Sequence, residues 1–175
     1  YKYSRDDLQQ ILAKYYWNRD YPGQQMIQQI SPMLCRQLSK LKEHEIAEVW
    51  SDFSDYVLEL KMNGCRGLLH IHPNGNIFVT SRRISDKTYR YSQNELNVPH
   101  ITNSNFSSFE DSIFDGEFVS PKHVIRTVGV ETTNQLQAAV AILNCDPEKA
   151  VRIQQDNECY LLYYVWDCLR INGAD

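Results

Sequence analysis

The feature that most constrains this fold is an Asn-Gly pair, Asn74-Gly75, set between two apolar runs. The runs cover residues 68–72 and 77–81, and both are rich in side chains that favour strands. Asn and Gly tolerate positive φ angles, so this dipeptide is a strong indicator of a tight antiparallel hairpin. We therefore predict an antiparallel sheet at the centre of the chain.

Further strands are expected on both sides of the hairpin. Residues 56–61 alternate apolar and polar side chains, and residues 87–92 and 113–119 have the composition of short strands. Residues 159–167 form a continuous apolar and aromatic run, which is typical of a strand buried on both faces. Residues 97–108 are rich in Asn and Ser, so we expect a loop there.

Apolar residues recur at helical spacing in four segments, residues 4–16, 26–30, 46–50 and 133–143. Asp146 followed by Pro147 is expected to begin one more helix, with the acid as its N-cap. The order of the elements indicates an α+β fold, helices first and then a mostly antiparallel sheet. We place residues 1–52 in an N-terminal helical segment and residues 53–175 in the sheet-containing domain.

Composition excludes several classes of protein. The chain has 175 residues and a net charge of −4, which argues against nucleic-acid binding by bulk charge alone. No run approaches the roughly 18 apolar residues of a membrane-spanning helix. The five cysteines contain no C-x-x-C pair, so we expect neither a zinc site nor a disulfide framework. A reducing intracellular compartment, cytoplasm or nucleus, is the resulting expectation.

Lys61, Gly64 and Arg66 form the first candidate chemical site. A lysine after an apolar strand and before a glycine turn can present its amine to a cleft. The amine is a nucleophile only when its pKa is lowered, by burial or by nearby positive charge. Because Lys-x-x-Gly is a common pattern, an exposed lysine before a turn stays an open alternative.

Two acidic and aromatic segments add to this candidate. Asp115-Gly116-Glu117 lies within a predicted strand, and Trp166-Asp167 ends the aromatic run. The acid could contact a ribose hydroxyl or a metal, and the indole could stack on a base. An edge acid and a core aromatic residue are the alternatives. His44-Glu45-Ile46-Ala47-Glu48 lacks the second histidine of a zinc-protease helix, so we interpret it as a solvated helix face.

In this order the motifs resemble those of the ATP-dependent DNA ligases, within the covalent nucleotidyltransferase superfamily. Residues 61–66 match the family's K-x-D-G-x-R motif except at Asn63, where the family has Asp. Ser81-Arg82, Asp115-Gly116-Glu117 and Trp166-Asp167 match the next motifs in sequence. The resemblance implies the nucleotidyltransferase (ATP-grasp-like) adenylation domain, incomplete at its C-terminus, with low activity or none from these residues alone.

The resemblance also implies a reaction and a role for each matching residue. Lys61 would attack the α-phosphate of ATP to form lysyl-AMP, and the AMP would then activate the 5′-phosphate of a nick. Trp166 would stack on adenine, and Glu117 would contact ribose or Mg²⁺. The nucleotide-binding set implied in this way is Glu59, Leu60, Arg66, Arg82, Glu117 and Trp166, with Arg82 and Arg83 placed against DNA phosphates.

ATP, Mg²⁺ and nicked double-stranded DNA are therefore the expected cofactors and partners, with no membrane and a monomeric protein. The expected processes are DNA repair, replication and recombination. An RNA ligase or, less favoured, a capping guanylyltransferase of the same superfamily is the first alternative. A non-catalytic nucleic-acid-binding module that kept the fold is the second, and Asn63 in place of the family's Asp favours it.

Overall fold

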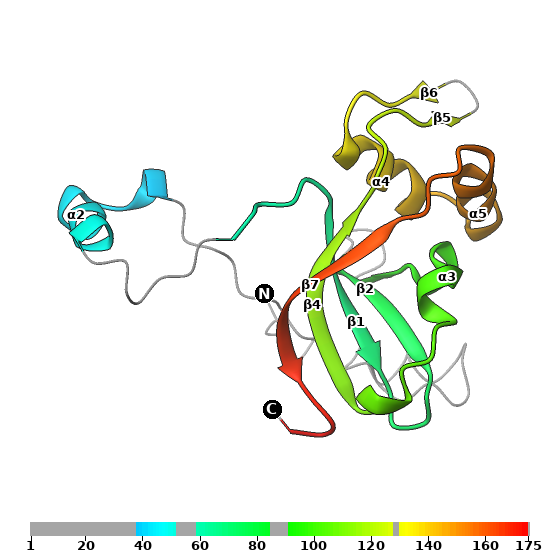
Figure 1. The fold of residues 1–175 in the computed structure, drawn as a ribbon, viewed down its shortest axis with the longest axis horizontal. Coiled ribbons are helices and arrows are strands. Elements are labelled where there is room, and N and C mark those ends of the chain that lie inside the picture. The colour runs from blue at the N-terminus through cyan, green and yellow to red at the C-terminus, as the bar shows by residue number, and fades with distance from the viewer. Residues whose placement is uncertain (1–37, 52–58, 85–90, 128–129, 175) are drawn as a thin grey trace, which may run out of the picture. The chain divides into compact units, whose positions relative to one another are not determined.

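Five antiparallel strands form the main sheet within the described part of the chain (Figure 1). The computed structural model describes residues 38–51, 59–84, 91–127 and 130–174. The sheet order is β3-β2-β1-β4-β7, and all four pairings are antiparallel. Its strands are β1 (Cys65–Ile71), β2 (Ile77–Ile84), β3 (Tyr91–Gln93), β4 (Ser112–Val119) and β7 (Leu162–Arg170), while β5 (Arg126–Thr127) and β6 (Val130–Glu131) form a separate ribbon. The predicted α+β class with an antiparallel sheet is confirmed.

The helices of the described ranges are short. They are α2 (Glu43–Ser51), α3 (Pro99–Thr102), α4 (Gln135–Leu143), α5 (Pro147–Asp156) and the 3₁₀ turns η1 (Leu38–Lys40), η2 (Glu95–Asn97) and η3 (Ser107–Phe109). The helices predicted at 46–50, at 133–143 and after Asp146 are therefore confirmed, and those at 4–16 and 26–30 lie outside the described residues. None of the helices just given has the length and apolar character of a membrane span.

The caps of α4 and α5 differ. Asn134 accepts a hydrogen bond from the Gln137 amide at 2.9 Å, as an N-cap side chain should. Asp146 occupies the N-cap position of α5, but its side chain makes no capping hydrogen bond. Pro147 at the first helical position fixes φ there and needs no partner for a missing N–H.

The hairpin between β1 and β2 closes through residues 72–76, where the His72 amide donates to the Asn76 carbonyl at 2.9 Å. Ile71 pairs with Ile77, and the Gly75 amide donates to the His72 carbonyl at 2.9 Å. Of the Asn-Gly pair only Gly75 has a positive φ, +80°. The hairpin is thus confirmed, with one left-handed residue after a turn rather than two.

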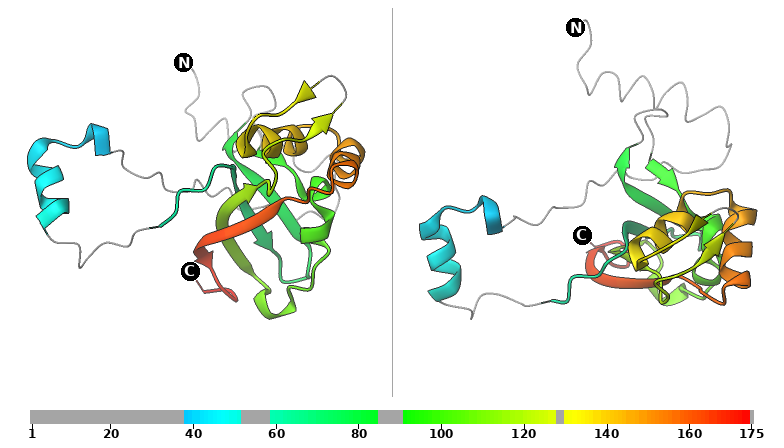
Figure 2. Two further views of the ribbon diagram at one scale, coloured as in Figure 1. Left: turned by 45° about the horizontal axis from the view of Figure 1, so that its top comes forward. Right: turned by 90° about the horizontal axis from the view of Figure 1, so that it is seen from above.

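One face of the sheet carries the apolar core. Leu69, Val79 and Phe118 belong to the same buried cluster as side chains of α4 and α5, which lie side by side in both views of Figure 2. The helical members are Ala138, Ala139, Ile142, Leu143, Ala150 and Ile153. Because successive side chains of a strand alternate between faces, residues between these core positions point to the opposite face.

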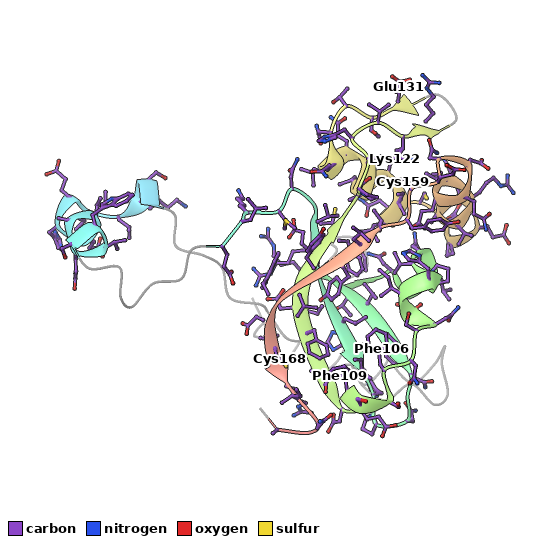
Figure 3. The ribbon with its side chains drawn as sticks, viewed as in Figure 1. Phe106, Phe109, Lys122, Glu131, Cys159 and Cys168 are labelled. Carbon is purple, nitrogen blue, oxygen red and sulfur yellow. The ribbon has the colours of Figure 1, made fainter. Side chains whose placement is uncertain are left out.

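β7 corrects one prediction. The aromatic run was expected to be buried on both faces, but β7 is an edge strand with β4 as its neighbour in the described sheet, and Leu162, Tyr164 and Val165 are exposed. Figure 3 shows Cys168 on the same strand. An apolar run indicates a strand. Whether other elements cover both faces of that strand depends on the rest of the fold.

Two β-bulges interrupt the pairing of β7 with β4. Asp115 pairs with Asp167 while Gly116 pairs with Val165, which leaves Trp166 as the extra residue. A second register shift leaves Leu169 extra. Bulges re-aim side chains and increase strand twist.

Three local predictions have mixed outcomes. Residues 59–61 are irregular, so the described part of the strand expected at 56–61 is wrong, and residues 56–58 lie outside the described ranges. β3 confirms the last two positions of the strand expected at 87–92, and residues 87–90 lie outside the described ranges. Residues 97–108 contain α3 and part of η3 rather than a plain loop, since Pro99 favours the first turn of a helix. The domain boundary at residue 52 stays a prediction.

Candidate active site

Side chains from three separate motifs meet on the sheet face opposite the helical core. Arg66 of β1 lies directly across from Glu117 of β4, and Leu68 lies across from Asp115. Trp166 of β7 reaches the same group through its bulge. The alternation that turns Leu69 and Phe118 toward the helices turns these residues to the other face.

Arg66 and Asp115 form a two-point ion pair at the centre of this face. Arg66 Nε donates to Asp115 Oδ1 at 2.9 Å, and Nη2 donates to Oδ2. The Asp115 side chain is 2 % exposed and that of Arg66 18 %. A parallel pair of charge-assisted hydrogen bonds fixes the plane of the guanidinium as well as its position.

Trp166 lies beside this ion pair. The Arg66 guanidinium carbon is 5.7 Å from the centroid of the indole, within range of a cation–π interaction. The indole remains 37 % exposed. Arg66 therefore orients an aromatic surface that solvent, or a planar ligand, can still reach.

Glu117 connects the residues before β1 to β4. Its Oε1 accepts a hydrogen bond from the Gly64 amide at 3.0 Å. Burial raises the pKa of the Glu117 carboxyl, while this hydrogen bond and the charges of Arg66 and Arg82 act in the opposite direction. Because burial is the largest influence, the net pKa lies above the usual value for glutamate.

Gly64 is required by packing rather than by a left-handed conformation. A Cβ atom built at this position would lie 2.2 Å from the Phe118 carbonyl oxygen and 2.9 Å from Glu117 Cγ. The backbone of residue 64 therefore passes directly against β4. The close approach and the Gly64–Glu117 hydrogen bond together fix where the chain enters β1.

Lys61, Glu59 and Leu60 precede this fixed point. All three side chains are exposed, and their segment is irregular rather than the strand end that the sequence suggested. Leu60 is 84 % exposed. No hydrogen bond or ion pair joins these three residues to the Arg66 group within the part of the chain that the structure describes. The structure brings Arg66, Glu117 and Trp166 together and leaves Lys61, Glu59 and Leu60 outside that contact set.

Of the two adjacent arginines of β2, the structure describes the side chain of Arg82 and not that of Arg83. Arg82 is half-buried, and its charge lowers the pKa of Glu117, so it belongs to the electrostatic surroundings of the site. The backbone of Arg83 lies in β2, but its side chain is outside the described residues.

Sequence reasoning placed Asp115 in a motif without a role of its own and did not consider His70 or Tyr163. His70 Nε2 lies 2.9 Å from Thr80 Oγ1, and burial lowers the pKa of the imidazole to about 4. The Tyr163 hydroxyl is within hydrogen-bonding distance of the Gly67 carbonyl at 3.0 Å and the Phe114 carbonyl at 2.9 Å. The one available signal was an acid at position 115, in the middle of an apolar strand, where a buried charge needs a partner.

Glu117 is the carboxylate of this site that could bind a divalent metal ion. No cluster of three or more His, Cys, Asp or Glu side chains suited to a metal exists among the described residues. Asp115 is held by Arg66, whereas Glu117 Oε2 accepts no hydrogen bond from any described residue. Mg²⁺ commonly takes one or two protein carboxylates and completes its shell with phosphate oxygens and water, so Glu117 fits that limited role.

An antiparallel sheet with helices on one face and an Arg, Asp, Glu and Trp group on the other defines the class, an α+β nucleotidyltransferase adenylation domain. The family model described as ATP dependent DNA ligase domain matches residues 32–175, so the chain belongs to this family. A search of curated proteins gave no match. Family membership implies ATP and nucleic acid as the substrates.

Proposed function

We propose that the chain takes part in ATP-dependent sealing of nicked DNA and that its own chemical step is formation of lysyl-AMP on Lys61. The observation that carries this proposal is the meeting of three family motifs, separated by as many as 100 residues, around Arg66. The match of the family model over residues 32–175 supports the same assignment. DNA repair, replication and recombination are the processes that this activity would serve.

In the proposed step the Lys61 amine attacks the α-phosphorus of ATP. A nitrogen–phosphorus bond forms, and the bond from that phosphorus to the bridging oxygen breaks, so that pyrophosphate leaves. The amine must be unprotonated to attack, and its proton passes to solvent. Gly64 lies three residues after Lys61, and its hydrogen bond to Glu117 anchors the end of the segment that carries Lys61.

The neighbouring side chains would bind the nucleotide. Trp166 offers an exposed indole face for adenine, and Arg66 and Arg82 offer planar donors for ribose or phosphate oxygens. Glu59 and Leu60 would contact the adenine from the segment before Lys61. A Mg²⁺ ion held through Glu117 Oε2 would supply positive charge beside the phosphates.

The later steps concern DNA. The AMP would move to the 5′-phosphate of a nick, and the 3′-hydroxyl would displace it. Arg82 and Arg83 would contact the DNA backbone, which carries no sequence information and suits an enzyme that acts at any nick.

The location of the protein is part of the proposal. Cys65, Cys145, Cys159 and Cys168 all carry free thiols, which supports a reducing intracellular compartment. A monomer acting on one nick remains our expectation for the oligomeric state.

The test is covalent labelling of the natural polypeptide with ATP carrying a radioactive α-phosphate, in the presence of Mg²⁺. We expect an acid-labile adduct on Lys61, no adduct in Lys61→Arg, and normal labelling in Lys149→Arg, which changes an exposed lysine of α5 in the same way. An arginine cannot form the adduct because it is never deprotonated in proteins. Labelling by GTP, or sealing of nicked RNA in preference to DNA, would move the assignment to a capping enzyme or an RNA ligase. A folded polypeptide without any adduct would overturn it.

A further inference from the structure

Asn63-Gly64 has a chemistry of its own, independent of nucleotide binding. An asparagine followed by glycine can cyclise, because the glycine amide nitrogen attacks the Asn side-chain carbonyl carbon without a side chain in its way. The chain contains three such pairs, Asn63-Gly64, Asn74-Gly75 and Asn172-Gly173. The three asparagines are all exposed, so exposure alone does not separate them.

The backbone conformation at the three pairs does separate them. Gly75 and Gly173 lie in left-handed turns with φ of +80° and +82°. Their amides donate to backbone carbonyls, Gly75 to His72 and Gly173 to Asp111, both at 2.9 Å. The Asn74 side chain is itself held, because its Oδ1 accepts a hydrogen bond from the Asn76 amide at 3.1 Å.

Gly64 has a different hydrogen-bond acceptor. Its amide donates to the Glu117 carboxylate at 3.0 Å, and its φ is not in the left-handed region. A charged acceptor makes a stronger bond and polarises the N–H, which raises the electron density on the nitrogen. Asn63 itself belongs to no helix or strand, and its side chain is exposed.

We propose that Asn63 is a self-modification site, at which the Gly64 nitrogen converts the asparagine into aspartate or isoaspartate. The Gly64 nitrogen bonds to Asn63 Cγ, and the Cγ–Nδ2 bond breaks. The Asn63 amide nitrogen leaves as ammonia, carrying the proton lost from Gly64. Water then adds to one carbonyl carbon of the cyclic imide and opens the ring, so no oxidant or reductant is involved.

The two products have opposite consequences. Opening at Cγ gives an ordinary aspartate at this position and restores the acid that the family motif carries two residues after its lysine. Opening at the main-chain carbonyl gives isoaspartate, which inserts a methylene into the backbone between Lys61 and the fixed Gly64. The effect of either product on the lysine motif rests on the proposed function. The modification itself is detected as a change in peptide mass.

The test is a time course of the folded natural polypeptide at neutral pH, followed by proteolysis and mass spectrometry of the three Asn-Gly peptides. We expect conversion at Asn63 to be faster than at Asn74 and Asn172. In urea the three rates should converge, because the difference arises from the fold. Electron-transfer fragmentation distinguishes aspartate from isoaspartate in the products.

Two variants probe the hydrogen bond. Glu117→Gln keeps an oxygen acceptor but removes its charge, so conversion at Asn63 should slow by about tenfold while the rate at Asn74 is unchanged. Glu131→Gln, the same substitution on the exposed ribbon strand β6, should change neither rate. Slower conversion at Asn63 than at Asn74 in the wild-type chain, or an unchanged rate in a folded Glu117→Gln variant, would overturn the proposal. Because the readout is mass, loss of lysyl-AMP formation would leave it standing, and failure here would leave the ligase assignment standing.

Discussion

Replacing Asp115 by alanine removes one half of the ion pair that organises the site. Both oxygens of Asp115 are bound to Arg66, and the carboxylate is 2 % exposed. In Asp115→Ala the guanidinium, whose side chain is 18 % exposed in the wild-type protein, loses the two oxygens of Asp115. Removing one partner of a buried pair costs about 3–5 kcal/mol, and the partial exposure of Arg66 places the expected loss near the lower end, about 3 kcal/mol.

The matched control is the ion pair of the β5–β6 ribbon, where Arg126 Nε contacts Glu131 Oε2 at 2.9 Å. These side chains are 81 % and 57 % exposed, and Figure 3 shows Glu131 on this ribbon. Exposed pairs contribute about 0–1 kcal/mol, so Glu131→Ala should be nearly neutral. The two single substitutions thus compare the loss of an arginine–carboxylate ion pair at a buried position and at an exposed one.

Urea unfolding followed by circular dichroism measures both variants against the wild-type chain. Equal slopes with a lower midpoint for Asp115→Ala alone would indicate a loss of stability without a change in the unfolded state. The double variant Arg66→Met, Asp115→Leu removes both charges and should recover most of the loss. A midpoint of Asp115→Ala equal to that of Glu131→Ala would refute the assignment of the buried pair as a structural centre.

Three further predictions concern the surroundings of this pair. Trp166→Ala should weaken ATP binding by about 1–3 kcal/mol, the usual contribution of one base–aromatic stack, and an unchanged ATP-induced shift in melting temperature would contradict it. Burial lowers the pKa of His70 from 6.5 to about 4, so the unfolded chain binds the additional proton between these values. Stability is then greatest above pH 6.5 and falls by about 3 kcal/mol as pH decreases through that window. His70→Asn should flatten this part of the pH profile, and an identical slope in the variant would show that other groups cause it. Asn63→Asp in the natural polypeptide should change nick sealing more than lysyl-AMP formation, because we expect the added charge to act near the DNA ends, and equal changes in both assays would argue against that placement.

The parts of the fold that the sequence predicted are those encoded locally. Asn74-Gly75 lies within the hairpin that it closes, and Pro147 lies at the first position of the helix that it begins. In each case the residue and the structure that it favours are within a few positions of one another. Tertiary contacts had little opportunity to override these preferences.

The arrangement of the site was only partly predictable. The family resemblance indicated Arg66, Glu117 and Trp166, which lie together in the structure. It gave no role to Asp115, because the Arg66–Asp115 pair joins positions 49 residues apart through the register of β1 and β4. Such a register depends on the whole sheet, since a shift of one residue would turn Asp115 to the opposite face.

The sequence also did not indicate that β7 lies at an edge of the described sheet. The run that ends in Trp166 has the composition of a central strand, and its place beyond β4 follows from the order β3-β2-β1-β4-β7. Lys61 illustrates the same difficulty at the other end of the site. Its segment alternates like a strand, but the close passage of Gly64 against Phe118 forces an irregular path into β1.

The two bulges of β7 affect how the protein behaves at high concentration. An edge strand that carries exposed Tyr164 and Val165 is the kind of surface on which a second chain can add a strand and begin to aggregate. Pairing of that sort needs several consecutive residues in register along a flat edge. The extra residues Trp166 and Leu169 twist the strand at two points only three residues apart. The same bulge that presents an indole to the site therefore disfavours regular pairing of a second chain along this edge of the described sheet.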